Sequence, residues 1–126
     1  MDKYITFAGY LEGVKYLIPQ FDVFLMTSKN EGGPVSMLEA FLMKVPVVIT
    51  KVGIVPEAIT NGKNGFYSNV GDYKGLAENI ETLLENFELR ENFVSEAHSV
   101  LFQEFTMEAN ANKTYRLYKT ILNEKY

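Results

Sequence analysis

Glu31 and Glu39 are the residues of this sequence best suited to chemistry, because they flank a Gly-Gly-Pro turn with seven residues between them. A carboxylate accepts hydrogen bonds, so either side chain could face the hydroxyl groups of a ligand. Paired carboxylates also serve in glycosidases, where the carboxyl groups face each other across a sugar-filled cleft. Nothing in the sequence indicates a second wall for such a cleft, which argues against a glycosidase.

The turn between the two glutamates leads into a segment with helical periodicity. Pro34 suits the first position of that helix, because its missing N–H would have no partner there and its φ angle is already helical. A helix that begins at about Pro34 leaves the backbone amides of Gly33, Val35 and Ser36 without partners inside the helix. Such amides, at the positive end of the helix dipole, are predicted to bind an anion such as phosphate.

The two carboxylates restrict the kind of anion that this site would accept. Because carboxylates repel phosphate, Glu31 and Glu39 have to face uncharged parts of the ligand. Glu31 precedes the helix and Glu39 lies about one turn inside it, so hydroxyl groups are expected on both sides of the phosphate. A nucleotide-sugar is a ligand of that kind. A plainer interpretation also exists, in which Glu31 is an ordinary loop residue and Glu39 only stabilises the helix dipole.

A β-α-β unit is predicted to position these residues. Residues 22–26 (DVFLM) form a strand that is apolar throughout, which is typical of a parallel strand covered on both faces. The helix follows, and residues 45–50 (VPVVIT) form the next strand. Parallel strands end at one edge of a sheet, so the loops at residues 29–33 and 51–55 are expected to meet there.

The sequence before this unit predicts one more strand. Residues 3–8 (KYITFA) are rich in β-branched and aromatic residues, and the predicted strand ends at Gly9 and Tyr10. This strand end is expected at the same edge of the sheet as the other two loops. A short amphipathic piece over residues 14–18 follows.

The sequence after the unit becomes helical. A short helix over residues 56–59, a turn cluster over residues 61–65 and a last strand at residues 66–67 are predicted. From Asp72 onward, three sets of apolar residues recur at helical spacing, and Thr106 suits the cap of the third helix. In the third set, Tyr115 and Tyr118 are expected to pack in the core. The acidic residues of this part of the chain are expected to form a solvated face, namely Glu78, Glu81, Glu85 and Glu88. The fold class is therefore α/β, a doubly wound parallel sheet with a C-terminal helical layer.

Composition excludes several classes of protein. The 126 residues suffice for a single domain, and 47% hydrophobic with 22% charged residues is ordinary for a globular protein. The net charge of −4 argues against a protein that binds the nucleic-acid backbone. The lack of cysteine excludes thiolate metal sites, disulfides and thiol nucleophiles. With a single histidine, His98, a zinc site or a His-based triad is not expected, and that residue is assigned a structural role.

The sequence also bears on the compartment. It has no apolar run of membrane-spanning length and no segment laid out like a signal peptide. Together with the lack of cysteine, this predicts a cytoplasmic protein.

Several short pieces have the order and spacing of a known family over nearly the whole chain: ITFAGY, FDVFLMTS, EGGPVSMLEA, PVVIT, VGIVPEAI, NGKNGFY, and EFTME followed by YRLY. With them the sequence resembles the C-terminal, donor-binding half of retaining glycosyltransferases of the family-4 type, which have the GT-B fold. The resemblance implies a Rossmann-like half of that fold that lacks its first βα unit.

The resemblance implies a role for each residue of the predicted site. The family's first glutamate contacts the donor sugar near the reacting carbon, which assigns the catalytic role to Glu31. The second glutamate grips the ribose hydroxyls, which assigns that role to Glu39. The diphosphate is held by backbone at the start of the intervening helix, here Gly32, Gly33, Val35 and Ser36. The loop at Gly9 and Tyr10 would lie near the base.

The chain departs from the family pattern at two positions. Most members have a glycine just before the PVV strand, where this chain has Met43, Lys44 and Val45. The family's second glycine after the VG pair is Ile54 here. Larger side chains restrict φ and ψ where glycine would not, so either change is expected to narrow the pocket or alter the loop.

Residues 1–126 are therefore interpreted as a single nucleotide-sugar-binding domain, a fragment of a two-domain glycosyltransferase that is inactive on its own. The family's arginine and lysine for the diphosphate come from further upstream, as does its acceptor-binding domain. No metal or other cofactor is expected, nucleic acid is not a partner, and any contact with the inner face of a membrane would be made by the missing part. The alternative hypothesis is a non-catalytic module that binds a nucleotide or a protein partner.

Overall fold

The computed structural model describes residues 3–124 of the chain. Three short strands form one parallel sheet in which neighbours in the sequence are neighbours in space. The strands are β1 (Phe24–Met26), β2 (Val47–Thr50) and β3 (Phe66–Ser68). Each lies inside or within one residue of a predicted strand, so the predicted β-α-β unit is confirmed.

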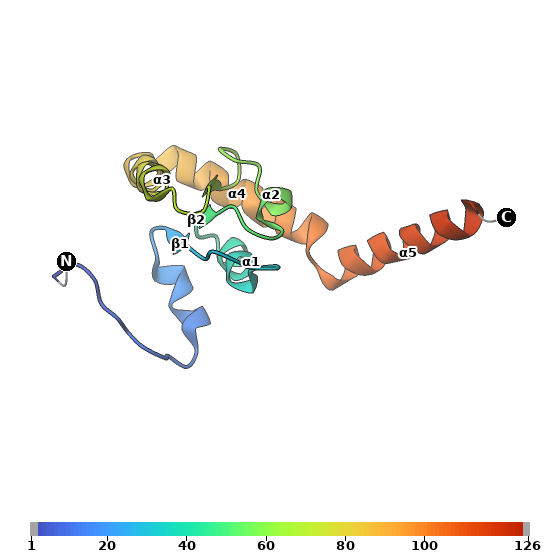
Figure 1. Ribbon diagram of the computed structural model, residues 1–126, viewed down its shortest axis with the longest axis horizontal. Coiled ribbons are helices and arrows are strands. Elements are labelled where there is room, and N and C mark those ends of the chain that lie inside the picture. The colour runs from blue at the N-terminus through green and yellow to red at the C-terminus, as the bar shows by residue number, and fades with distance from the viewer. Residues whose placement is uncertain (1–2, 125–126) are drawn as a thin grey trace.

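Helices connect the strands and then form a layer of their own (Figure 1). Within residues 3–124, two 3₁₀ helices precede β1, two α-helices join the strands, and three longer α-helices follow β3. Their bounds are η1 Val14–Tyr16, η2 Ile18–Gln20, α1 Val35–Leu42, α2 Val55–Ala58, α3 Tyr73–Glu85, α4 Phe87–Glu104 and α5 Met107–Glu124. The predicted cap of α5 is confirmed, because the Thr106 hydroxyl oxygen accepts a hydrogen bond of 3.1 Å from the amide of Ala109.

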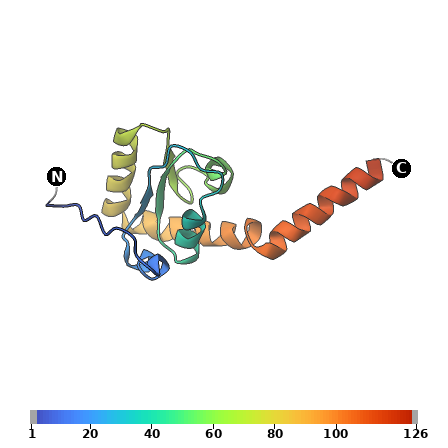
Figure 2. The same cartoon turned by 60° about the horizontal axis from the view of Figure 1, so that its bottom comes forward.

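The central strand β2 is buried on both faces, which makes the sheet doubly wound. Val47 and Ile49 belong to a cluster with buried residues of α1, α2 and α4. Val48 points to the opposite face, where it packs with Leu83 of α3 and Phe93 of α4. Figure 2 shows α3 and α1 on opposite sides of the strands. Because side chains alternate along a strand, the run VVIT supplies apolar groups to both layers.

The predicted strand at residues 3–8 is wrong. These residues form no ladder, and their side chains are exposed, with Tyr4 87% and Phe7 90% accessible. A strand exists only through hydrogen bonds to a neighbour, and residue propensity alone does not provide one. The coverage predicted for the strand at residues 22–26 is also wrong on one face. Leu25, in register with the buried Val48, is 46% exposed.

The last helix, α5, extends away from the layered body (Figure 1). Tyr115 and Tyr118, which the helical spacing suggested as core residues, are 63% and 64% exposed.

Among the described residues, no helix combines the length and hydropathy needed to span a bilayer.

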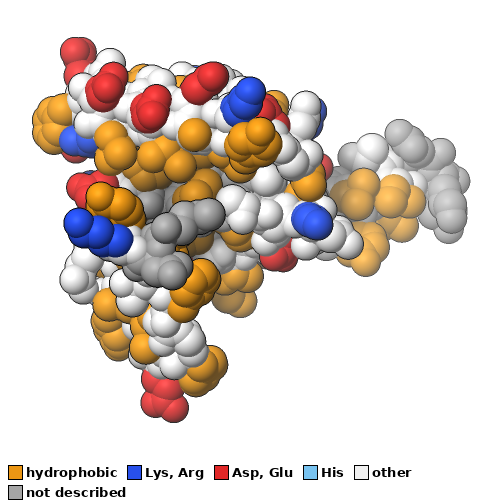
Figure 3. Space-filling model, turned by 60° about the vertical axis from the view of Figure 1, so that its left-hand side comes forward, with side chains coloured by type: hydrophobic (Ala, Val, Ile, Leu, Met, Phe, Trp, Pro, Cys, Tyr) orange, Lys and Arg blue, Asp and Glu red, His pale blue; other side chains and the backbone are white. Residues whose placement is uncertain are grey.

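The glutamates of α3 form an exposed face, as the sequence predicted. Glu78, Glu81 and Glu85 are all exposed. Figure 3 shows acidic side chains along the upper part of one side of the molecule, with hydrophobic side chains below them.

Candidate functional site

The predicted anion site lies at the beginning of α1, in the loop that follows β1. Pro34 does not occupy the first helical position that the sequence predicted for it. Its conformation is extended, with φ −71° and ψ 102°, so it caps the helix and Val35 is the first helical residue. Within the described residues, no backbone hydrogen bond uses the amide of Gly33, Val35 or Ser36. The first amide with a partner is that of Met37, which donates to the carbonyl of Pro34 at 3.1 Å. The helix therefore begins with bare amides next to an exposed glycine turn.

The loop after β2 packs directly against this turn, as predicted from the strand ends. Ile54 donates a backbone hydrogen bond of 3.1 Å to the carbonyl of Gly32. Gly53 has φ +48°, and a β-carbon there would overlap the carbonyl oxygens of Glu31 and Gly32. Only glycine combines this backbone conformation with so close an approach. The position of the Glu31–Gly32 backbone is therefore set by the neighbouring loop.

The Glu31 side chain is half-buried and has a hydrogen-bond partner within its own loop. The hydroxyl of Ser28 donates to Glu31 Oε1 at 3.1 Å. The backbone of Ser28 is in turn held by Thr50, whose hydroxyl donates to the Ser28 carbonyl at 2.6 Å. Ser28 and Thr50 were not recognised in the sequence as site residues. Their position at the carboxyl ends of β1 and β2 is the signal that could have found them.

Glu39 lies one turn into α1 and is also half-buried. The core-facing side of α1 is made of Met37, Ala40 and Phe41. Ser36, three residues before Glu39 and so on the same side of the helix, donates its hydroxyl to the sulfur of Met26 in β1 at 3.7 Å. Glu39 is thus placed on the side of the helix that faces β1. Along the chain, the unpaired amides lie between Glu31 and Glu39.

Both departures from the family pattern have structural consequences. Lys44 has φ +57° and is the one non-glycine residue with positive φ in the described part of the chain. It lies in the segment where the resemblance implies a glycine. A positive φ angle strains the backbone of a lysine but not that of a glycine. Ile54 covers Gly33, since its Cδ1 lies 3.5 Å from where a β-carbon on Gly33 would be. This side chain narrows the space over the turn.

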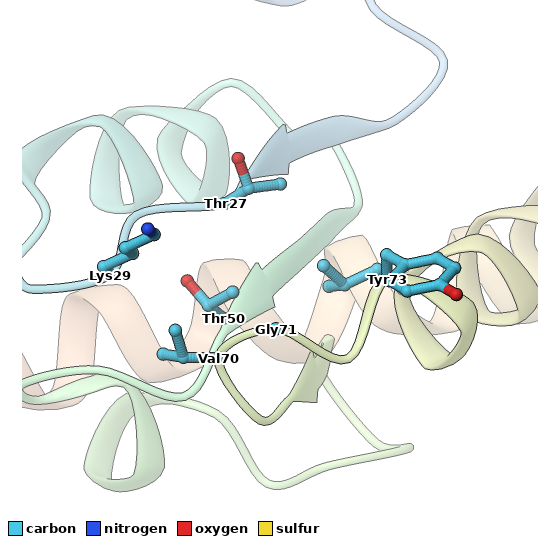
Figure 4. Close-up of a pocket in the computed structure, with 7 residues that line it drawn as sticks. Thr27, Lys29, Thr50, Val70, Gly71 and Tyr73 are labelled. Carbon is cyan, nitrogen blue, oxygen red and sulfur yellow. The ribbon is translucent and has the colours of Figure 1, made fainter.

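A hollow of about 360 Å³ opens at the same edge of the sheet. Figure 4 shows its lining residues around the ends of β1 and β2 and the start of α3. Thr27, Lys29 and Thr50 come from the strand ends, and Val70, Gly71, Tyr73 and Leu76 from the segment after β3. Thr50 therefore borders the hollow and anchors the loop that carries Glu31.

Gly9 and Tyr10 are not brought to this edge by a strand. They lie in the exposed segment before η1, and Tyr10 is 91% exposed. Their proximity to a base stays a prediction. His98 is half-buried in α4, where its ring lies 4.8 Å from that of Phe102, as expected for a structural residue. Within residues 3–124, no three side chains of metal-ligating type lie together.

Comparison with known proteins places the chain in a family. The sequence profile described as "Glycosyl transferases group 1" matches residues 2–100. N-acetyl-alpha-D-glucosaminyl L-malate synthase of Bacillus anthracis is 30% identical over 120 residues, which are 95% of this chain and 32% of the relative. The chain spans about a third of the length of such curated relatives.

Solved structures agree with this assignment. HepE from Anabaena, solved in complex with UDP, superimposes with a TM-score of 0.82 at 27% identity, over 94% of this chain and 33% of HepE. The C-terminal domain of LpcC, a group 1 glycosyl transferase family protein from Francisella tularensis, superimposes with a TM-score of 0.71 over 82% of this chain and 53% of that one. Its 22% identity bears on the fold alone. The predicted Rossmann-like half of a GT-B fold is confirmed, and the chain belongs to the group 1 glycosyl transferase family.

Proposed function

We propose that this chain is the donor-binding part of a glycosyltransferase that moves a sugar from a nucleoside-diphosphate-sugar to an acceptor hydroxyl with retention of configuration. The observation that carries the proposal is the start of α1, where the bare amides of Gly33, Val35 and Ser36 lie between Glu31 and Glu39. A doubly charged diphosphate suits the amides, and the neutral sugars on either side of it suit the carboxylates.

Each part of the site has its own task in this proposal. The amides stabilise the negative charge that grows on the diphosphate as it leaves. Glu31 orients the sugar and stabilises the positive charge that develops at its ring. Glu39 accepts two hydrogen bonds from the ribose diol. The acceptor attacks from the face that the diphosphate leaves, and the charge on the diphosphate is met by amides and by cationic side chains, without a metal ion.

The relatives support the donor class. HepE has been solved with UDP, with UDP-glucose, and with UDP and glucose. Because this chain spans about a third of its relatives, the acceptor and the complete reaction belong to the proposal.

Calorimetric titration of the chain with UDP and with GDP tests the proposal. Glu39→Ala removes both ribose hydrogen bonds and is expected to weaken binding of the nucleotide at least tenfold. Glu81→Ala, an exposed glutamate of α3, is the matched control and should bind as the unmodified chain does. Equal affinity of the Glu39→Ala and Glu81→Ala variants would contradict the assignment of Glu39 to the ribose.

A further inference from the structure

We propose that Ser28 and Thr50 are positioning residues, which form a hydrogen-bonded chain that holds the carboxylate of Glu31 in a single orientation toward the donor sugar. The inference rests on the proposed function for the role of Glu31, but the chain of hydrogen bonds can be tested without any ligand. Neither residue touches the reacting atoms in this account. Both act through Glu31.

The chain of hydrogen bonds begins at a rigid point. Thr50 is the last residue of the central strand β2 and is 1% exposed. Strand β2 lies between β1 and β3, and Thr50 is paired with Ser68 of β3, so the backbone that carries its hydroxyl is held in place. That hydroxyl donates to the carbonyl of Ser28 at 2.6 Å. Figure 4 shows the Thr50 hydroxyl pointing toward the segment that carries Thr27 and Lys29.

The second hydrogen bond holds the carboxylate of Glu31 against Ser28. Ser28 Oγ donates to Glu31 Oε1 at 3.1 Å, and the two side chains are both half-buried. A glutamate without such a partner samples several rotamers in solution. With the partner, one oxygen of Glu31 is occupied by Ser28 and the other oxygen stays available to a ligand hydroxyl.

The backbone of Glu31 is held independently of the hydrogen bonds from Thr50 and Ser28. Gly53 and Ile54 fix the Glu31–Gly32 backbone from the opposite loop, through close contact and a 3.1 Å hydrogen bond. Removing the Ser28 hydroxyl therefore frees the Glu31 side chain while the turn and its bare amides stay in place. A role of Ser28 in holding the whole turn would instead move both.

The test measures three-bond carbon–carbon and nitrogen–carbon couplings across the Glu31 χ1 angle by NMR in the isotope-labelled chain. The unmodified chain, Ser28→Thr and Thr50→Ser keep the hydroxyl groups and should show couplings of a single rotamer. Ser28→Ala should show couplings averaged over several rotamers. The near-isosteric Thr50→Val should show couplings between those of the unmodified chain and those of Ser28→Ala. Ser99→Ala, an exposed serine of α4, is the matched control. Averaged couplings in the unmodified chain, or unchanged couplings in Ser28→Ala, would overturn the inference.

Titration of the same variants with UDP, GDP and ADP separates orientation from support of the turn. The affinity of Ser28→Ala for the nucleotide that binds should stay within twofold of the unmodified chain, because the amides are undisturbed. A loss of tenfold or more would show that Ser28 supports the turn, and would overturn the inference. If no nucleotide binds the unmodified protein while its Glu31 has a single rotamer, the proposed function fails. The inference that Ser28 and Thr50 orient Glu31 then stands on its own.

Discussion

Gly53 lies against the carbonyl oxygen of Glu31 so closely that a β-carbon at residue 53 would overlap it. The two residues belong to loops that follow neighbouring parallel strands, β1 and β2. This contact joins the loop of the first glutamate to the loop that covers the bare amides. The site is therefore built from two strand ends, and its geometry depends on a residue that carries no functional group.

Gly53→Ala is expected to lower the free energy of unfolding by at least about 2 kcal/mol, because it adds a steric overlap to the cost of a positive φ angle. Gly71→Ala is the matched control, since Gly71 also has positive φ, +89°, but a β-carbon added there would meet no atom within 4 Å. Urea unfolding of both variants measures the difference. Equal destabilisation of the two would contradict the close packing of the loops.

Lys44→Gly is expected to stabilise the chain by about 0.5–1 kcal/mol, because glycine adopts the observed φ of +57° without the strain of a side chain. Thermal unfolding should show a Tm higher by a few degrees. Lys44→Ala keeps the β-carbon and so keeps the strain. If Lys44→Ala stabilised the chain as much as Lys44→Gly, the lysine side chain, and not the backbone, would be responsible.

Asn64→Ala is expected to cost about 2–3 kcal/mol, because Asn64 is 2% exposed and pairs two backbone groups that would be left without partners. Its Oδ1 accepts from the amide of Thr60 at 2.8 Å, and its Nδ2 donates to the carbonyl of Ala58 at 2.9 Å. Asn61→Ala removes one hydrogen bond at an exposed residue and should cost less. Chemical denaturation that ranks the two variants in the reverse order would refute this explanation.

Glu31→Ala is expected to leave the affinity for a bare nucleoside diphosphate within about threefold of the unmodified chain, because Glu31 faces the sugar in the proposed complex. Glu39→Ala is the informative comparison, since it should weaken binding of the same nucleotide. Titration with UDP and GDP measures both variants. Loss of nucleotide affinity of the same size in the two variants would show that the two glutamates do not divide the ligand as proposed.

The part of the fold that was predictable from the sequence is the part governed by short-range pattern. Local sequence patterns predict β1, α1 and β2 in the correct order. These patterns are the Gly-Gly-Pro turn, the helical periodicity after it and the apolar run at Val47–Thr50. The approach of the two loops also followed, because parallel strands end at one edge of a sheet. These are the features that bring Glu31 and the amides together.

The features that failed depend on partners that residue pattern does not supply. Residues 3–8 have strand propensity but no ladder, and the apolar face of Tyr115 and Tyr118 is exposed. The hydrogen bond from Thr50 to Ser28 escaped prediction for a related reason. The Thr50 and Ser28 positions are 22 residues apart, and their contact follows from the register of β1 with β2.

The most direct test of the central claim is an NMR titration of the isotope-labelled chain with UDP, GDP and ADP. At least one of these nucleotides should shift the backbone amide signals of Gly33, Val35 and Ser36 more than those at the N-termini of α3 and α4. Saturable shifts centred on these three amides would support a diphosphate site at the start of α1. Unchanged signals for all three amides with every nucleotide, or shifts centred elsewhere, would contradict it.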